Sequence, residues 1–119
     1  MIRHPELLLM DILEEIDSIL AESDTIEYTD FVTSNAKLKS TKYSLLVIGE
    51  ACSKFPEEIL QKYTKVNWRQ IKGLRNRIIH EYFGTNVKVI WKVVKEDIPI
   101  LKREILIILT NEFPNAIIE

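Results

Sequence analysis

The residues with the clearest chemical potential lie in one short segment, GLRNRIIHEYFG at positions 73–84. Within it Arg75 precedes His80 in the spacing R-x4-H, and a polar residue follows the arginine directly. Histidine is the side chain suited to proton transfer near neutral pH. Arginine offers a permanent charge and a bidentate fork for phosphate oxygens. The segment therefore carries two groups that phosphate chemistry needs.

Cleavage of RNA is the reaction that this pair fits. RNA carries its own nucleophile, the 2′-OH, beside the scissile phosphate. In-line attack requires a base for that hydroxyl, an acid for the leaving 5′-oxygen and a cation for the charge that builds on phosphorus. Histidine and arginine can supply these functions without a metal ion or another cofactor. The pattern thus predicts a metal-independent ribonuclease with Arg75 and His80 as its catalytic residues.

The spacing R-x4-H also has a purely structural interpretation. A histidine near the end of a helix can donate to a last-turn carbonyl and interact favourably with the helix dipole. Arg75 can equally form a surface ion pair. The residues alone leave both interpretations open. The other histidine, His4, lies near the start of the chain and is not expected to have a functional role.

The charge distribution is uneven although the net charge is only −2. Residues 1–30 contain nine acids and a single base, Arg3, whereas no acid occurs between Glu58 and Glu81. A basic segment in an otherwise acidic chain is a possible footprint for phosphate, and it is equally compatible with a solvated face that neutralises the acidic N-terminal helix. In the first case the RNA-binding residues are Arg69, Lys72 and Arg77.

A helix carrying the segment would not bring its two key side chains together by itself. At about 100° per residue, Arg75 and His80 lie roughly 140° apart around a helix. Asn76 and His80 are four residues apart and share a face. Two copies of the helix meeting across a two-fold axis would bring arginine and histidine together, which predicts a dimer with a composite cleft.

Bulk properties describe one ordinary globular domain, residues 1–119. The apolar fraction is 46% and the charged fraction 29%, both usual for this class. A single cysteine, Cys52, excludes an internal disulfide and is expected to be a small buried hydrophobe. The N-terminal residues do not resemble a signal peptide, and the longest apolar run, residues 105–109, is too short to span a membrane. The expected location is the cytoplasm.

Helical periodicity extends through nearly the whole chain and predicts an all-α, up-and-down bundle of four to five main helices. Pro5 is expected to open the first helix, and a short helix is expected around residues 28–32. Asn35 is expected to cap a long third helix that Pro56 ends, with a brief helix through Tyr63. The remaining helices are expected from Trp68 to Phe83, from Thr85-Asn86, and from Pro99 through Phe113.

Local signals support the boundaries of the helix that would carry Arg75 and His80. Asn67 with Gln70 three residues later resembles a capping box at its start. Gly84 suits the left-handed position that commonly follows the end of a helix. The β-branched residues at 105–108 are the best strand candidate, but the all-helical context and the length of the periodic segment favour a helix there.

Several motifs in order resemble one known family. They are I-G-E-A at residues 48–51, W-R at 68–69 and G-L-R-N-R-x-x-H-x-Y-F-G at 73–84, with D-I-L at 11–13, Trp91 and D-I-P at 97–99 in addition. This combination is similar to the HepT-like branch of the HEPN domains, and it covers nearly the whole chain.

The resemblance implies an all-α bundle that forms a homodimer, or a higher oligomer, with the two R-x4-H segments facing each other. It implies metal-independent ribonuclease activity, with Arg75, Asn76 and His80 as the matching catalytic residues. It also implies a toxin–antitoxin pair in which a minimal nucleotidyltransferase (MNT) transfers AMP from ATP to the motif tyrosine, here Tyr82. The alternative for Tyr82 is a core tyrosine with its hydroxyl at the surface.

This chain departs from the family shortly before the I-G-E-A string. Many members carry an arginine and a glutamate where this chain has Tyr43 and Leu46. Gly49 is expected to be a site of close helix packing. Glu50 has two interpretations of equal weight, in which it orients Arg75 across the bundle or pairs with a lysine.

Two classes of function follow from these observations. One is an RNase toxin, favoured because arginine, asparagine, histidine and tyrosine occur together in the motif. The other is a non-catalytic helical module that binds a nucleotide or a partner beside a nucleotidyltransferase, a role that has no need of histidine and arginine together.

Overall fold

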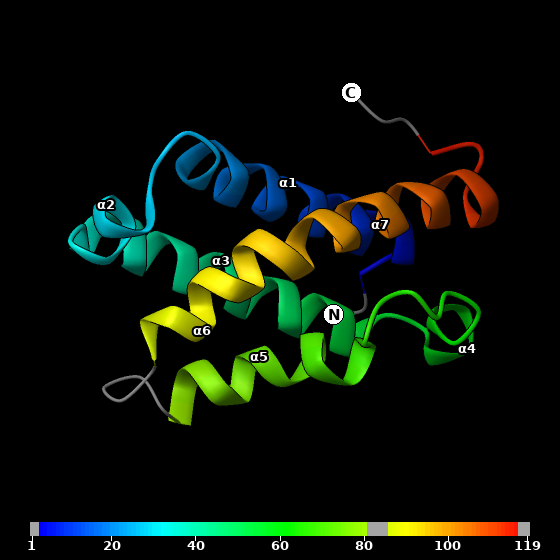
Figure 1. Ribbon diagram of the computed structural model, residues 1–119. Helices are drawn as coiled ribbons and strands as arrows, with labels where there is room; N and C mark the ends of the chain where they lie inside the picture. The colour runs from blue at the N-terminus through cyan, green and yellow to red at the C-terminus, as the bar shows by residue number, and fades with distance from the viewer. Residues whose placement is uncertain (1–2, 81–85, 117–119) are drawn as a thin grey trace.

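The computed structural model describes residues 3–80 and 86–116, and every regular element in these ranges is a helix (Figure 1). The α-helical fold class predicted from the sequence is therefore confirmed. The elements are α1 (Pro5–Ser23), α2 (Tyr28–Val32), α3 (Asn35–Lys54), α4 (Glu57–Leu60), α5 (Trp68–His80), α6 (Val87–Lys92), the π-helix η1 (Val93–Asp97) and α7 (Ile98–Glu112).

Helix α3 is the centre of the arrangement, because it packs against α1 on one side and α5 on the other. In Figure 1, α1 lies above α3 and α5 lies below it, at the lower edge of the molecule. Helix α7 packs on α1 and continues directly from η1. The core that joins them consists mainly of buried aliphatic side chains, such as Leu9, Ile16 and Ile48, and it includes the phenylalanines Phe31 and Phe55. Helix α5 is thus an outer helix attached mainly through α3.

The beginnings of two helices show how local sequence sets their limits. Pro5 occupies the first turn of α1, where its missing N–H leaves no hydrogen bond unmade. Helix α3 is capped by Ser34, whose side chain accepts a hydrogen bond from the backbone of Lys37. The prediction that Asn35 is the cap was wrong by one residue, because the serine hydroxyl performs this function equally well.

Pro99 opens the last helix, as predicted, but the chain is not interrupted before it. Helices α6 and α7 are joined by η1 into one continuous helical run (Figure 1). Pro99 has no N–H for the carbonyl four residues earlier, and its ring would collide with that carbonyl in a regular α-helix. The π-turn widens the helix just before Pro99, and the N–H of Ile98 reaches back to Val93 O. Pro99 thus lies in the first turn of α7, as predicted, and the π-segment before it keeps the helical run continuous.

The helix in the connection between α3 and α5 is shorter than predicted. Helix α4 ends at Leu60, and turns carry the chain on to Tyr63. The Tyr63 hydroxyl donates to Glu112 at 2.8 Å, and burial is the main cause that raises the pKa of Tyr63. The indole N–H of Trp68 donates to the carbonyl of Tyr63 at 2.8 Å. These bonds fix the start of α5 relative to the end of α7.

Two glycines in neighbouring helices have opposite surroundings. A Cβ added to Gly49 would lie 3.1 Å from Arg75 N and 3.1 Å from Ile71 O, both backbone atoms of α5. A Cβ added to Gly73 would meet nothing within 4 Å. Gly49 therefore permits the close approach of α3 and α5, as predicted, whereas Gly73 lies on the open side of α5.

This contrast gives a stability prediction with its own control. Gly73→Ala should raise the free energy of unfolding by about 0.5–1 kcal/mol, because alanine is the better helix former and no contact opposes it. Gly49→Leu should lower the free energy of unfolding by about 1–3 kcal/mol through overpacking against the α5 backbone. Urea denaturation of both variants checks the pair. A Gly49→Leu variant as stable as the wild type would contradict the close approach.

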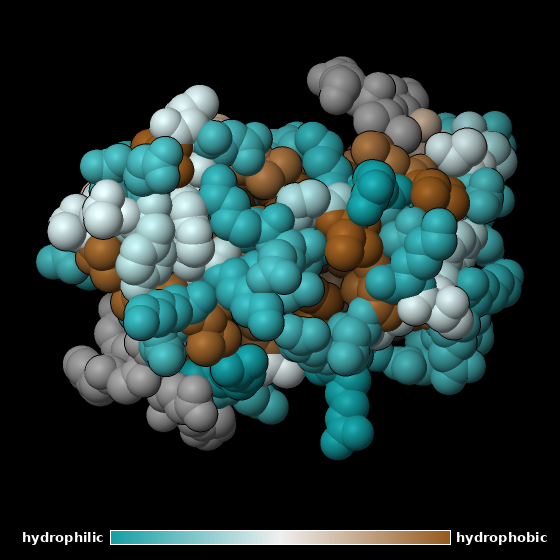
Figure 2. All heavy atoms as spheres, in the orientation of Figure 1, coloured by the Kyte–Doolittle hydropathy of each residue, from teal (hydrophilic) through white to brown (hydrophobic). Residues whose placement is uncertain are grey.

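The surface seen in Figure 2 is mostly hydrophilic, with hydrophobic residues in scattered groups. Within residues 3–80 and 86–116, no helix has the length and apolar character needed to cross a membrane.

Candidate active site

Helix α5 holds the predicted catalytic segment on the outside of the bundle. Its inner face consists of Ile71, Leu74 and Ile78, each at most 4% exposed. Arg75, Asn76 and Arg77 are all exposed. The apolar positions thus anchor the helix, and the polar residues between them face solvent, where a substrate can reach them.

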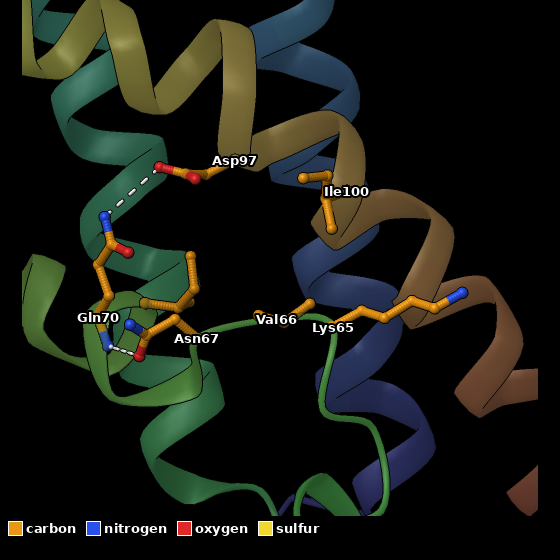
Figure 3. Close-up of a pocket in the computed structure, with 7 residues that line it drawn as sticks. Lys65, Val66, Asn67, Gln70, Asp97 and Ile100 are labelled. Carbon is orange, nitrogen blue, oxygen red and sulfur yellow. Dashed lines mark hydrogen bonds between the residues drawn. The ribbon is translucent and has the colours of Figure 1, made fainter.

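The start of α5 is fixed by one half of the predicted capping box. Asn67 Oδ1 accepts a hydrogen bond from the backbone N–H of Gln70 at 3.1 Å. The Gln70 side chain does not complete the box, because its amide points instead toward Asp97 at 3.5 Å (Figure 3). The helix start is therefore linked directly to η1.

Arg75 is joined to the central helix by an ion pair with Glu50. Arg75 Nε lies 2.8 Å from Glu50 Oε2, and the other carboxylate oxygen lies 3.5 Å from Lys54 Nζ. The two interpretations of Glu50 given by the sequence are therefore both correct. Gly49, the neighbour of Glu50, makes this contact possible because it lets the α5 backbone approach α3 closely.

The geometry of this ion pair suits an arginine that must also bind phosphate. The contact uses Nε, and the guanidinium carries two further nitrogens that can donate in a fork. The Arg75 side chain is 47% exposed, so solvent and ligands can reach it. A half-exposed pair adds little stability. The ion pair with Glu50 instead favours one rotamer of Arg75 over the others.

His80 is the last residue of α5. The regular helix through this position keeps Arg75 and His80 roughly 140° apart around the axis. The imidazole of His80 is not part of the described structure. Tyr82, Phe83 and Gly84, with the predictions of a modification site and a C-terminal glycine cap, also lie outside the described residues.

The other predicted RNA-binding residues differ in their surroundings. Arg69 and Arg77 are exposed on α5. Lys72 is only 23% exposed in its side chain and forms an ion pair with Glu57 on α4. Arg69 and Arg77 therefore offer accessible charge, whereas Lys72 also connects α5 to α4.

Charge is segregated between the helices. Helix α1 carries six acids and no lysine or arginine. Helix α3 carries four lysines and one acid, and α5 carries three arginines, one lysine and no acid. Because α5 and α1 lie on opposite sides of α3 (Figure 1), the basic side of the molecule includes the R-x4-H helix. This arrangement favours a polyanionic ligand at α5.

A small cavity near the start of α5 is too confined for a nucleotide (Figure 3). It has a volume of about 40 Å³ and is lined by Lys65, Val66, Asn67, Gln70, Ile71, Asp97 and Ile100. Burial raises the pKa of Asp97, with the neighbouring charge of Glu96 as a second cause. A space of this size holds water and not a substrate. We assign the cavity a structural role.

A larger groove lies between α3 and α5, and the sequence analysis did not identify it. Its volume is about 370 Å³, and it is lined by Lys39, Lys42, Tyr43, Leu46, Ile78 and Ile79. In the sequence, Tyr43 and Leu46 stand out only as departures from a family pattern. The signal that could have revealed the groove is the helical spacing 39-42-43-46, which places lysines, an aromatic ring and a leucine on one face.

Metal-binding and thiol chemistry find no support in the described ranges. No group of three or more His, Cys, Asp and Glu residues within 3–80 and 86–116 is placed to hold a metal ion. Cys52 is buried, as predicted, and burial raises the pKa of its thiol to about 12. Cys52 is therefore a packing residue, since its thiolate is not available at neutral pH.

Comparison with known proteins shows which family this chain is similar to. The family model described as ribonuclease HepT-like matches residues 11–108. A protein of Caldanaerobacter subterraneus subsp. tengcongensis, named as a candidate RNase, is 36% identical over 108 residues, which cover 91% of this chain and 96% of the relative.

Archaeal relatives show similar agreement. A protein of Thermococcus cleftensis named as a probable ribonuclease HepT is 37% identical over 94 residues, covering 79% of this chain and 86% of the relative. A candidate RNase of Methanocaldococcus jannaschii is 36% identical over 96 residues, which cover 81% of this chain and 79% of the relative. Comparison with the solved structures gives no significant match.

Proposed function

This chain belongs to the HepT-like ribonuclease family, and on that premise we propose that it is a metal-independent endoribonuclease that uses Arg75 and His80. The observation that carries the proposal is the ion pair between Glu50 and Arg75. It holds an exposed guanidinium on the surface of the helix that ends at His80. Together these features provide a fixed cation and a titratable group on one accessible helix.

The proposed reaction is attack of the RNA 2′-oxygen on the adjacent phosphorus. His80 takes the proton from the 2′-OH, the 2′-oxygen bonds to phosphorus, and the bond to the 5′-oxygen breaks. The 5′-oxygen takes a proton from water as it leaves, and the His80 imidazolium then returns its proton to the hydroxide, so one histidine suffices for each site. Arg75 stabilises the charge on the phosphoryl oxygens, and Asn76 can donate a hydrogen bond to them. The products carry a 2′,3′-cyclic phosphate and a 5′-hydroxyl.

The proposed assembly is a two-fold dimer in which α5 of one protomer faces α5 of the other. Arg75 and His80 diverge around the helix axis, so one protomer does not direct both side chains at one phosphate. Across a two-fold axis, arginine of one protomer and histidine of its partner converge. The open surroundings of Gly73 support this, because the outer side of α5 has room for a second chain.

Mixing two inactive variants tests both the reaction and the assembly. Arg75→Ala and His80→Ala, unfolded and refolded together, should recover about a quarter of wild-type cleavage in EDTA. Random association makes half of the dimers heterodimers that contain one chain of each variant. Each heterodimer holds one complete and one inactive site, so a quarter of all sites are complete. Each variant refolded alone should stay inactive. Recovery no greater than the sum of the separate variants would contradict a site shared between protomers.

We further propose that the protein is the toxin of a toxin–antitoxin pair with an MNT nucleotidyltransferase as its antitoxin. Transfer of AMP from ATP to the Tyr82 hydroxyl would release pyrophosphate and form a phosphodiester. The added negative charge and bulk, two residues after His80, would oppose RNA binding. The competing function is a non-catalytic subunit that binds a nucleotide or a partner, and it predicts no RNA cleavage.

A further inference from the structure

The groove between α3 and α5, called the α3–α5 groove below, has walls that suit a flat aromatic ligand. Tyr43 is 65% exposed and Ile79 is 48% exposed, although both are large hydrophobic side chains. Leu46 and Ile78 complete the apolar part of the lining. An exposed aromatic ring beside aliphatic side chains presents a surface on which a planar group can stack.

The polar part of the lining has a single sign. Lys39 and Lys42 line the groove, and none of the described residues that line it is an acid. Lysines beside an exposed aromatic ring are the combination with which proteins hold single-stranded nucleic acid, where the bases stack and the cations contact phosphates. A second copy of this chain fits less well. It would bring four lysines together, and the six lining residues are few for a stable protein contact, which buries about 800 Å² per partner.

The groove continues directly from the proposed active site. Ile79 follows Arg75 by four residues, so the two positions lie about 6 Å apart along α5 and share one side of it. Asn76 lies three residues after Gly73 and shares the side of α5 that the proposed dimer uses. A nucleotide in the groove would therefore be a close neighbour of a phosphate held by Arg75.

We propose that the α3–α5 groove binds a base of the RNA strand next to the scissile phosphate, stacked on the ring of Tyr43. Lys39 and Lys42 contact phosphates of the same strand. This inference rests on the proposed function, because it makes the groove a substrate-binding subsite of the ribonuclease. It assigns to Tyr43 a role in substrate affinity and in the choice of cleavage position.

Binding of an uncleavable oligonucleotide tests the proposal without relying on catalysis. The probe is a fluorescein-labelled, single-stranded 2′-O-methyl RNA, which has no free 2′-OH, and its affinity is measured by fluorescence anisotropy. Tyr43→Ala should weaken binding by about five- to a hundredfold, the range expected for one stacked base. Tyr43→Phe, which keeps the ring, should bind as the wild type does. Tyr43→Leu, which keeps only apolar bulk, should resemble Tyr43→Ala.

Abasic probes identify the stacked base. One position of the probe at a time is made abasic. At one position the wild type should bind the abasic probe more weakly than the intact probe, whereas Tyr43→Ala should bind both probes equally. Equal losses for both proteins at every position would overturn the proposal. It would also be overturned if Tyr43→Ala bound RNA normally but changed the oligomeric state in light scattering, because the groove would then be a contact between copies. Failure of the wild type to cleave RNA would refute the proposed function and leave this binding result intact.

Discussion

The variants Arg75→Ala and His80→Ala should each cleave RNA at least about a hundredfold more slowly than the wild type, the usual contribution of a charge-stabilising or proton-transferring group. Arg75→Ala removes the cation that faces the phosphate. His80→Ala removes the group that takes the proton from the 2′-OH. The assay is cleavage of single-stranded RNA in EDTA, with fragments separated by gel electrophoresis.

Both variants should remain folded, which makes the loss of activity interpretable. Arg75 is half-exposed and its ion pair with Glu50 is partly solvated, so little stability depends on it. His80 ends α5 and is not needed to continue it. Arg103→Ala is a matched control, because Arg103 is an exposed arginine on α7 and lies outside the proposed site. It should cut RNA at the wild-type rate. Wild-type activity of His80→Ala would refute the mechanism.

Tyr82→Phe should separate cleavage from its control. The variant keeps the ring, Arg75 and His80, so it should still cut RNA. It lacks the oxygen that accepts AMP, so the MNT partner with ATP should neither modify nor silence it. For the wild-type protein, modification adds negative charge beside a site that must attract phosphate. RNA affinity should then fall steeply, most of all at low salt.

Mass spectrometry after incubation with the partner and ATP decides this prediction. The wild type should gain the mass of one AMP unit per modified tyrosine, and Tyr82→Phe should gain none. The exposed tyrosine in the α3–α5 groove, Tyr43, provides the internal comparison, because Tyr43→Phe should be modified as the wild type is. Equal modification of Tyr82→Phe and the wild type would place the acceptor elsewhere.

The sequence was sufficient to predict the helices because their apolar positions recur with helical spacing. Residues such as Ile12, Ile16 and Ile19 of α1 recur at steps of three and four, and all three are buried. Pro99 shows the limit of this approach. A proline within a periodic segment predicts the start of a helix, which is correct for α7, but the π-turn that joins α7 to the preceding helix depends on the packing of both flanks.

The candidate site could be predicted only in part for a related reason. The exposure of Arg75 follows from its place between buried positions of one helix. Its partner Glu50 lies 25 residues earlier, and only the approach of α3 and α5 at Gly49 brings the two side chains to 2.8 Å. The α3–α5 groove combines residues from both helices in the same way. Neither helix alone contains the groove, so the spacing 39-42-43-46 on α3 indicates only one of its walls.

The chemistry of the cut ends tests the central claim most directly. Wild-type protein and single-stranded RNA are incubated in EDTA, and the fragments are analysed by mass spectrometry. An attack by the 2′-oxygen predicts fragments that end in a 2′,3′-cyclic phosphate, with 5′-hydroxyls on their neighbours, and no cut where the 2′-OH at the cleavage position is replaced by hydrogen. Fragments ending in a free 3′-hydroxyl and a 5′-phosphate, or cutting of the 2′-deoxy position at the normal rate, would show that water or another nucleophile attacks and would contradict the account.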